Sequence, residues 1–432
     1  MILIYSPQTS PRLAYTAKFL FSTILGIPAS FTSNTEEYSQ YTLPKINYSN
    51  ENLDGITLLP HSLLFEDTIK SFVPEFFKFN DFPTLFPVSN ESALPFDPFA
   101  ATFFMISRYE EYLKQPVDQH HRTIPNHTLA YKNNFLEIPV VDSWALMLRR
   151  LIEKKYPNFM FPEREYRFIP TIDVDVAYAY RCRGLLRTVG ASLKSLLKQN
   201  WKDNKRRFQT LFFNQTDPFD TFSLLSDWHD HHNLKPVFFF LVGQYGQYDK
   251  NLPASNVAIK HLIRDISEKY TVGIHPSYRS NYLPIRVTKE IERLHKITGT
   301  TISRSRQHFL MLQFPHTYQQ LISSGISKDY TMGYASMPGF RAGTCTPFPF
   351  YDLSKELETS LTIYPFQIMD GTLNQYLKLS PLEAVERISR LNAEVRKVNG
   401  TFITLWHNES LGEMRHWKNW REVYEALIKI AS

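Results

Sequence analysis

Residues 168–176, Phe168-Ile169-Pro170-Thr171-Ile172-Asp173-Val174-Asp175-Val176, combine an apolar run typical of a buried β-strand with two carboxylates at its end. Successive side chains of a strand point to opposite faces, so Asp173 and Asp175 are expected to lie on one side and close together. Two neighbouring carboxylates repel each other unless a cation lies between them or one of them takes a proton. The pair alone favours a strand end whose acids cap the next helix or face water. A cation site between the two acids is the alternative, and the residues at the other strand ends support it.

The composition around this stretch is that of a globular protein. The chain has 432 residues, of which 43% are hydrophobic and 15% aromatic, enough for a large core and two domains. The formal net charge of +6 is spread along the chain, so it suggests a mild preference for anionic partners and does not indicate nucleic acid binding. Only Cys182 and Cys345 are present, which argues against a disulfide framework or a thiolate zinc site.

Targeting signals are not apparent. The N-terminus has no basic segment followed by a long apolar core, and no apolar run approaches the roughly 20 residues that span a bilayer. We therefore expect a soluble, cytoplasmic protein.

The pattern of apolar residues divides the chain near residue 165. Residues 1–165 predict a smaller α/β domain of unknown role, with strands at 1–5 and 55–59 and helical segments at 12–25 and 99–112. Asp118, His120 and His121 could form a metal pair, but adjacent histidines point in different directions, so we expect a solvated loop.

From residue 166 to 432, strand and helix patterns alternate. The predicted strands are 167–173, 236–242, 271–275, 301–306, 329–333, 361–369 and 401–407. Such alternation predicts a mostly parallel sheet, either doubly wound or closed into a barrel. No glycine-rich phosphate loop follows a strand, which argues against a nucleotide-binding fold.

Residues 187–207 interleave seven lysines and arginines, including Lys198, with leucines that include Leu185 and Leu186 just before them. This pattern predicts a basic amphipathic helix. It could contact an anionic membrane, where a lipid-linked substrate might reside. An inserted helix with a solvated basic face is the favoured interpretation.

Polar residues follow the predicted strands at the edge where parallel β/α proteins bind ligands. They are Asp173, Asp175, His275, His308, Arg341, Asp370 and His407. Imidazole and carboxylate together suit a divalent cation that keeps positions open for water.

Four of these segments resemble the motifs of the polysaccharide deacetylases, carbohydrate esterase family 4, which include the nodulation-type chitooligosaccharide deacetylases. The matching segments, in the family's order, are Thr171-Ile172-Asp173-Val174-Asp175, Gly273-Ile274-His275-Pro276-Ser277, Gly339-Phe340-Arg341-Ala342-Gly343 and Leu405-Trp406-His407. The resemblance covers about residues 166–432. It implies a distorted (β/α)7 barrel, and the whole chain resembles a bacterial subgroup with an extra N-terminal domain.

The resemblance implies a role for each matched residue. Asp173 would be the catalytic base, Arg341 would orient that base, and His407 would be the general acid. Asp370 resembles an acid that tunes the general acid. Asp175 and His275 would be metal ligands.

One position departs from the family pattern. The family's second ligand histidine, four residues after the first, corresponds to Arg279. His308 is the candidate replacement, with Ser280 or a water molecule as weaker ones. The alternative for His308 is a packed or substrate-contacting histidine.

The resemblance implies a metal-dependent deacetylase, a hydrolase that removes an acetyl group from an N-acetylated or O-acetylated sugar in a polysaccharide or glycan precursor. The expected cofactor is a divalent ion, zinc first and cobalt, manganese or nickel as alternatives, which lowers the pKa of bound water. Asp173 would remove the proton from this water and His407 would protonate the leaving amine. The alternatives are an inactive carbohydrate-binding or scaffold protein and a metal-dependent amidohydrolase acting on a non-sugar amide. No obligate protein partner can be inferred.

Overall fold

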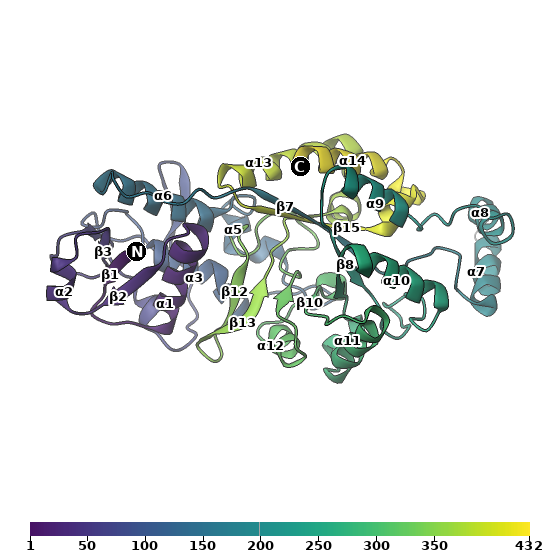
Figure 1. Cartoon of the computed structure of the whole chain (residues 1–432), viewed down its shortest axis with the longest axis horizontal. Coiled ribbons are helices and arrows are strands. Elements are labelled where there is room, and N and C mark those ends of the chain that lie inside the picture. The colour runs from purple at the N-terminus through teal and green to yellow at the C-terminus, as the bar shows by residue number, and fades with distance from the viewer. Residues whose placement is uncertain (198) are drawn as a thin grey trace.

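The computed structural model describes residues 1–197 and 199–432, leaving out the side chains of Leu185 and Leu186 (Figure 1). It is a mixed α/β protein with parallel sheets, so the predicted α/β class is confirmed. Lys198 lies outside the described residues.

The N-terminal part contains a small parallel sheet in the order β2-β1-β3-β4. Its strands are β1 (Ile2–Tyr5), β2 (Ala29–Thr32), β3 (Lys45–Asn47) and β4 (Ile56–Thr57), and β5 (Phe76–Phe79) and β6 (Phe82–Leu85) form a separate antiparallel hairpin. The helices are α1 (Pro11–Ala17), α2 (Thr35–Gln40), α3 (Pro98–Ile106), α4 (Tyr109–Tyr112), α5 (Leu129–Lys132) and α6 (Val140–Lys155), with a π-helix at Lys18–Ile24.

Side chains at the helix starts explain several of these boundaries. The Ser10 hydroxyl accepts the Leu13 N–H at the start of α1, and Asp97 accepts two N–H groups at the start of α3. The helix predicted at 99–112 is divided into α3 and α4 because Arg108 adopts a left-handed conformation with φ of 54°.

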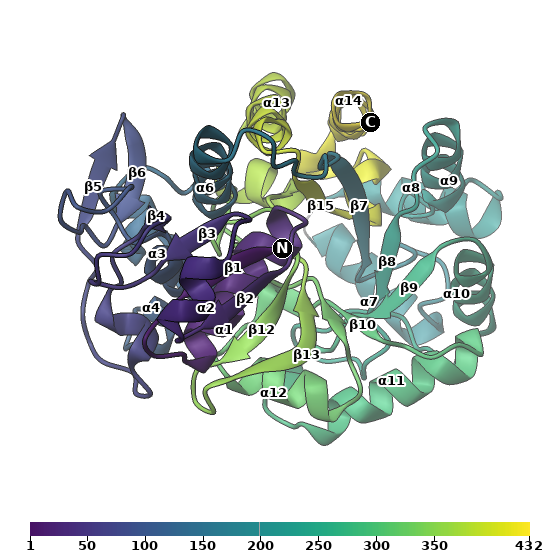
Figure 2. The same ribbon diagram turned by 60° about the vertical axis from the view of Figure 1, so that its left-hand side comes forward.

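The main sheet has nine strands among the described residues, in the order β12-β13-β11-β10-β9-β8-β7-β15-β14. They are β7 (Arg167–Val174), β8 (Val237–Phe240), β9 (Thr271–Ile274), β10 (Arg304–Ser305), β11 (Lys328–Asp329), β12 (Phe348–Asp352), β13 (Leu357–Ile363), β14 (Ile368–Met369) and β15 (Thr401–His407). All neighbours are parallel except β12 and β13. Figure 2 shows the strands in an arc with helices outside it. These are α9 (Phe222–His231), α10 (Val257–Lys269), α11 (Ile285–Thr298), α12 (His316–Ser323), α13 (Pro381–Lys397) and α14 (Trp420–Ala431).

The strand pairing of the described residues does not show the closed (β/α)7 barrel that was predicted, although the backbone N–H groups of Phe366 and Gln367 donate to the carbonyl oxygens of Met332 and Ile403 between β13 and β14. The segment predicted as one strand at 361–369 is two strands, because it leaves β11 at Ile363 and joins β15 at Ile368. Between them lies Pro365, which has no N–H to donate to a ladder. β14 and β12 are the two edge strands of the sheet. β12, which the sequence pattern missed, pairs with β13 in the antiparallel direction.

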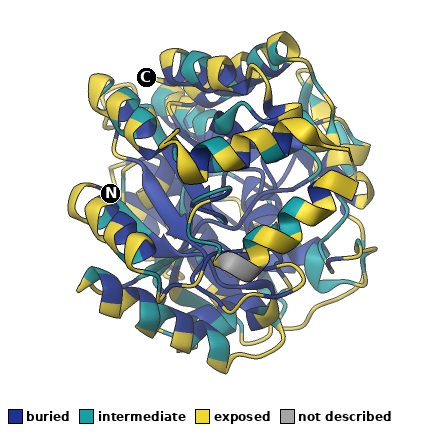
Figure 3. Ribbon diagram, turned by 90° about the vertical axis from the view of Figure 1, so that its right-hand side faces the viewer, coloured by how far each residue is buried: buried dark blue, intermediate teal, exposed yellow. Residues whose placement is uncertain are grey.

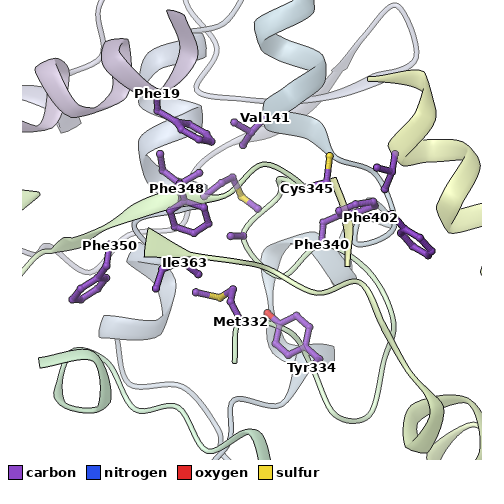
Figure 4. Packing of buried hydrophobic residues seen from close by; sticks show 14 of the residues in the cluster. Phe19, Val141, Met332, Tyr334, Phe340, Cys345, Phe348, Phe350, Ile363 and Phe402 are labelled. Atoms are coloured by element: carbon purple, nitrogen blue, oxygen red, sulfur yellow. The ribbon is translucent and has the colours of Figure 1, made fainter. Parts of the chain in front are cut away.

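One continuous hydrophobic core includes residues from both sides of position 165. Phe19 of the N-terminal part packs against Phe348 of β12, with ring centroids 5.9 Å apart, and Val141 lies in the same cluster (Figure 4). An ion pair between Arg12 and Glu356 adds to this contact. The division into two domains at residue 165 stays a prediction.

Two further helices, α7 (Leu185–Leu197) and α8 (Trp201–Phe212), form a hairpin that protrudes from the rest of the molecule (Figure 1). The basic segment predicted at 187–207 is thus divided between two helices. Across the residues with a described position, no helix combines the length and the apolar character needed to cross a bilayer.

Candidate active site

The strand register brings the predicted residues to one edge of the main sheet. Asp173 of β7 lies directly beside His407 of β15, and His275 follows the end of β9. Gly273 of β9 allows this close packing, because a Cβ atom there would lie 2.6 Å from the Phe239 ring and 2.9 Å from the Arg304 carbonyl oxygen. The carboxyl ends of these parallel strands therefore form one site.

Asp175, His275 and His308 come together at the centre of this edge. Each offers one ligand atom, and these atoms lie within 4.8 Å of one another. The Asp175 carboxylate is 3.1 Å from Nε2 of His275 and 3.4 Å from Nε2 of His308. Among the described residues, this is the one cluster of histidine, cysteine and acidic side chains with a geometry that could hold a metal ion.

The outer nitrogens of both imidazoles are held by acceptors. Nδ1 of His275 lies 2.6 Å from the Arg306 carbonyl oxygen, and Nδ1 of His308 lies 2.9 Å from the Asp249 carboxylate. A carbonyl oxygen can only accept, so Nδ1 of His275 carries a proton, and a neutral His275 presents a lone pair at Nε2. Asp249 favours the same arrangement at His308, as carboxylates do behind metal-bound histidines.

The donor set fits a divalent metal ion. Oδ1 of Asp175 is buried and has no hydrogen-bond partner, although Nε2 of His275 is 3.1 Å away. A buried oxygen without a partner is costly, and a cation would satisfy it. Two imidazoles and one carboxylate are a ligand set that zinc and other first-row divalent metals accept while keeping positions open.

The prediction that Arg341 orients Asp173 is wrong in its geometry. Arg341 is buried and pairs with Glu111 of the N-terminal part, and its Nη1 donates to the Gly333 carbonyl oxygen at 2.9 Å. Arg306 occupies the predicted place, because its Nη1 lies 2.9 Å from Asp173 Oδ1.

Arg306 is held rigidly behind Asp173. It also donates to the Thr171 hydroxyl at 2.7 Å and to the Tyr330 carbonyl oxygen at 2.9 Å, and its guanidinium lies 4.8 Å from the centroid of the Phe239 ring. The side chains of Arg306 and Asp173 are 0% and 2% exposed. The pair is therefore a fixed, buried arrangement with the second carboxylate oxygen of Asp173 directed toward His275, 3.8 Å away.

His407 is held by Asp370. The Asp370 carboxylate lies 2.8 Å from Nδ1 of His407 and accepts the His407 backbone N–H at 2.8 Å. Burial would lower the pKa of His407, but the carboxylates of Asp370, Asp175 and Asp173 outweigh it and raise this pKa to about 10. Nε2 of His407 faces Asp175 at 4.0 Å. A protonated imidazole at this position can donate to a group held between it and Asp175.

The carboxylates also shift the pKa of the predicted ligands. Burial would lower the pKa of His308, but Asp175 and Asp249 raise it to about 9. Burial would raise the pKa of Asp175, but His308 and His275 bring it well below its usual range. His308 thus lies between two carboxylates, Asp175 and Asp249, at the strand ends.

A cavity of about 190 Å³ opens over these residues. Its wall includes Phe309, Tyr376 and Trp417 together with Glu409. Burial raises the pKa of Glu409 to about 7, against the effect of His407. The sequence reasoning missed the roles of Arg306, Asp249 and Glu409. A signal existed for Arg306 alone, because it lies two residues before His308, the predicted metal ligand.

Other sequence candidates lie outside the metal cluster. His120 is buried, so the expectation of a solvated loop is wrong there, and its Nδ1 lies 3.2 Å from the Tyr278 hydroxyl. Asp118 pairs with Arg122. Arg279, at the position of the missing family histidine, is exposed.

Comparisons with known proteins give limited information. Residues 2–157 match the model of a family of unknown function, DUF7033. The search of curated proteins found no match. Three solved structures are similar at low sequence identity. A Mycobacterium smegmatis protein assigned as a polysaccharide deacetylase is 16% identical with a TM-score of 0.39, and the match covers 62% of this chain and 86% of that chain. The 4-alpha-glucanotransferase from Thermococcus litoralis is 12% identical with a TM-score of 0.38, and the match covers 62% of this chain and 37% of that chain. The GH57 branching enzyme TK1436 from Thermococcus kodakaraensis is 9% identical with a TM-score of 0.33, and the match covers 61% of this chain and 68% of that chain. TM-scores this low assign neither fold nor function.

Proposed function

We propose that the protein is a metal-dependent deacetylase that removes an acetyl group from an N-acetylated or O-acetylated sugar of a polysaccharide or glycan precursor. The observation that carries the proposal is the convergence of three elements in one cavity: the ligand set Asp175, His275 and His308, the Asp173–Arg306 pair and the His407–Asp370 pair. Together they provide a place for a metal ion, a carboxylate base and an imidazolium acid.

The metal ligands would be Asp175, His275 and His308, with Asp249 orienting His308. Zinc, or cobalt, manganese or nickel, when bound there would supply Lewis-acid activation of water and of the acyl oxygen. His308 thereby takes the place of the family histidine that Arg279 replaces. This arrangement argues against the inactive carbohydrate-binding alternative, because a third ligand would be present despite the missing histidine.

Asp173 would act as the general base. It lies beside the ligand set, and its orientation is fixed by Arg306, which occupies one carboxylate oxygen and leaves Oδ2 toward the cavity. Asp173 would accept the proton of the attacking water as the oxygen bonds to the acyl carbon. Such proton transfer contributes typically about 10²- to 10⁴-fold to the rate.

His407 would act as the general acid. Asp370 accepts the Nδ1 proton, and the raised pKa of His407 keeps a second proton on Nε2, which the leaving amine or alcohol would take when the bond to the acyl carbon breaks. The products are acetate and the free sugar amine or hydroxyl. Aromatic side chains on the wall, Phe309, Tyr376 and Trp417, could stack on a sugar ring.

The experiment is acetate release from a panel of N-acetylated saccharides, O-acetylated saccharides and small acetamides, after loading with each of the four metals. Asp173→Asn should lower kcat by at least about a hundredfold while metal binding persists. Asp265→Asn, the same change at an exposed position of α10, is the control. Activity on small amides alone would favour the amidohydrolase alternative, and full activity of Asp173→Asn would remove Asp173 from the mechanism.

A further inference from the structure

The hairpin of α7 and α8 carries a concentration of exposed apolar side chains. Leu197, Trp201 and Phe212 are 86%, 67% and 71% exposed. The others are Val189, Leu193, Leu196, Phe208, Leu211 and Phe213. In Figure 3 this end of the molecule faces the viewer, and exposed residues cover much of the two helices. Contiguous apolar surface of this kind marks a contact with a partner or a membrane.

Each helix presents its apolar residues as one stripe. Val189, Leu193 and Leu196 follow the i, i+4, i+7 spacing along α7. Trp201, Phe208 and Phe212 lie on one face of α8, and the Phe208 and Phe212 rings are 4.8 Å apart between centroids. The two helices are thus amphipathic with the apolar face outward.

The hairpin does not need these stripes for its own packing. Asp203 of α8 accepts hydrogen bonds from the Ser195 hydroxyl at 3.1 Å and the Tyr180 hydroxyl at 2.7 Å, and it pairs with Arg207 at 2.8 Å. Asn204 donates to the Ser192 carbonyl oxygen at 3.2 Å. These inner contacts join the helices to each other, so the outer apolar side chains remain available.

The charges around the stripes have one sign. Exposed cations flank them at Arg187, Lys194, Lys202, Lys205 and Arg206. Over the described part of 185–213, Asp203 is the one acid, and it is buried in its pair with Arg207. Two copies meeting through this face would bring like charges together, which disfavours self-association. Cations beside Leu, Trp and Phe fit an anionic lipid surface.

We propose that the α7–α8 hairpin binds the surface of an anionic membrane, with its apolar side chains in the headgroup region and its lysines and arginines against lipid phosphates. This binding does not depend on the proposed hydrolase activity.

A second cavity is lined by residues of the hairpin and by two residues that also line the cavity over the candidate active site. It measures about 320 Å³ and is lined by Thr188 and Ala191 of α7 and by Arg207 of α8. Glu409 and Trp417 line both this cavity and the one over the metal ligands. Membrane binding therefore places the candidate active site close to the lipid surface. If the proposed function holds, saccharides attached to lipid are the substrates within reach.

The test is sedimentation of the full chain with vesicles of phosphatidylcholine alone or mixed with phosphatidylglycerol, without substrate. Binding should require phosphatidylglycerol and weaken in 1 M salt, where the screening length falls to about 3 Å. Lys202→Gln/Lys205→Gln/Arg206→Gln should weaken binding about a hundredfold, since each cation near an anionic surface is worth about fivefold. Phe208→Ser/Phe212→Ser should weaken it at least about tenfold.

Matched variants elsewhere on the surface are the controls. Lys78→Gln/Lys132→Gln/Lys289→Gln removes the same charge from exposed positions outside the hairpin. Val73→Ser/Leu382→Ser removes apolar side chains that are 80% and 71% exposed. Both should bind like the wild type. The proposal is overturned if phosphatidylglycerol vesicles are not bound, if the controls lose as much binding as the hairpin variants, or if the hairpin instead mediates a dimer that light scattering detects and Phe208→Ser/Phe212→Ser dissociates.

Discussion

The pairing of Arg306 with Asp173 predicts a large coupling energy between these two positions. Arg306→Met would leave the Asp173 carboxylate buried without its partner at 2.9 Å, and it would also remove the bonds to Thr171 and Tyr330. Removing one partner of a buried pair costs about 3–5 kcal/mol. Because whole domains are stable by about 5–15 kcal/mol, this loss is readily measured.

The assay is a double-mutant cycle by urea unfolding, followed by tryptophan fluorescence in the presence of a chelator. Asp173→Asn in the Arg306→Met background removes the unpaired charge, so the double variant should be more stable than the sum of the single effects predicts, by at least about 2 kcal/mol. Arg341→Met provides the matched control, since Arg341 pairs with Glu111. It should be destabilising by itself and additive with Asp173→Asn.

Additive effects of Arg306→Met and Asp173→Asn would refute the reasoning. So would an equally large coupling of Arg341 with Asp173, which would restore the role that the sequence motif suggested for Arg341.

Three further predictions concern other contacts. Asp249→Asn should weaken zinc binding about 10- to 100-fold by titration calorimetry, because it removes the carboxylate behind His308; unchanged affinity would argue against that role. Burial lowers the pKa of His229 to about 4, against the effect of Asp230. The unfolded chain therefore binds a proton at His229 more readily than the folded protein does, so the free energy of unfolding falls as pH drops from about 7 toward 4. Between pH 7 and pH 5 the loss should be about 2 kcal/mol in urea unfolding and should be absent in His229→Gln; equal pH dependence of both proteins would contradict it. Gly339→Ala should cost at least about 2 kcal/mol, because φ is +131° and a Cβ atom would lie 2.5 Å from the Leu136 carbonyl oxygen; a thermal midpoint like that of the wild type would count against it.

The sequence predicted the residues at the strand ends better than the closure of the sheet. Apolar runs such as 167–173 and 401–407 are long enough to form strands by themselves, and β7 and β15 agree with them closely. The short strands β10 and β11 have two residues each and depend on pairing with neighbours, which the local pattern does not encode. The break at Pro365 could have been predicted from its missing N–H.

The candidate site was predictable where one strand end carries the residue, as for Asp173, His275 and His407. The partner of Asp173 was not predictable, because the motif order suggested Arg341, whereas Arg306, which follows β10, makes the ion pair. Glu111, which pairs with Arg341, lies 230 residues away in the N-terminal part, and no local pattern links the two. Asp249 likewise reaches His308 from a loop outside the strands.

The metal content of the purified protein tests the central claim most directly. Elemental analysis after exhaustive dialysis and reloading should find stoichiometric zinc or another divalent transition metal in the wild type and in Arg279→Ala. The metal should be lost in Asp175→Ala and in His308→Ala, because each removes one of the three converging ligands. A wild type that binds no metal even after reloading, or a His308→Ala variant that keeps it, would contradict the proposed site.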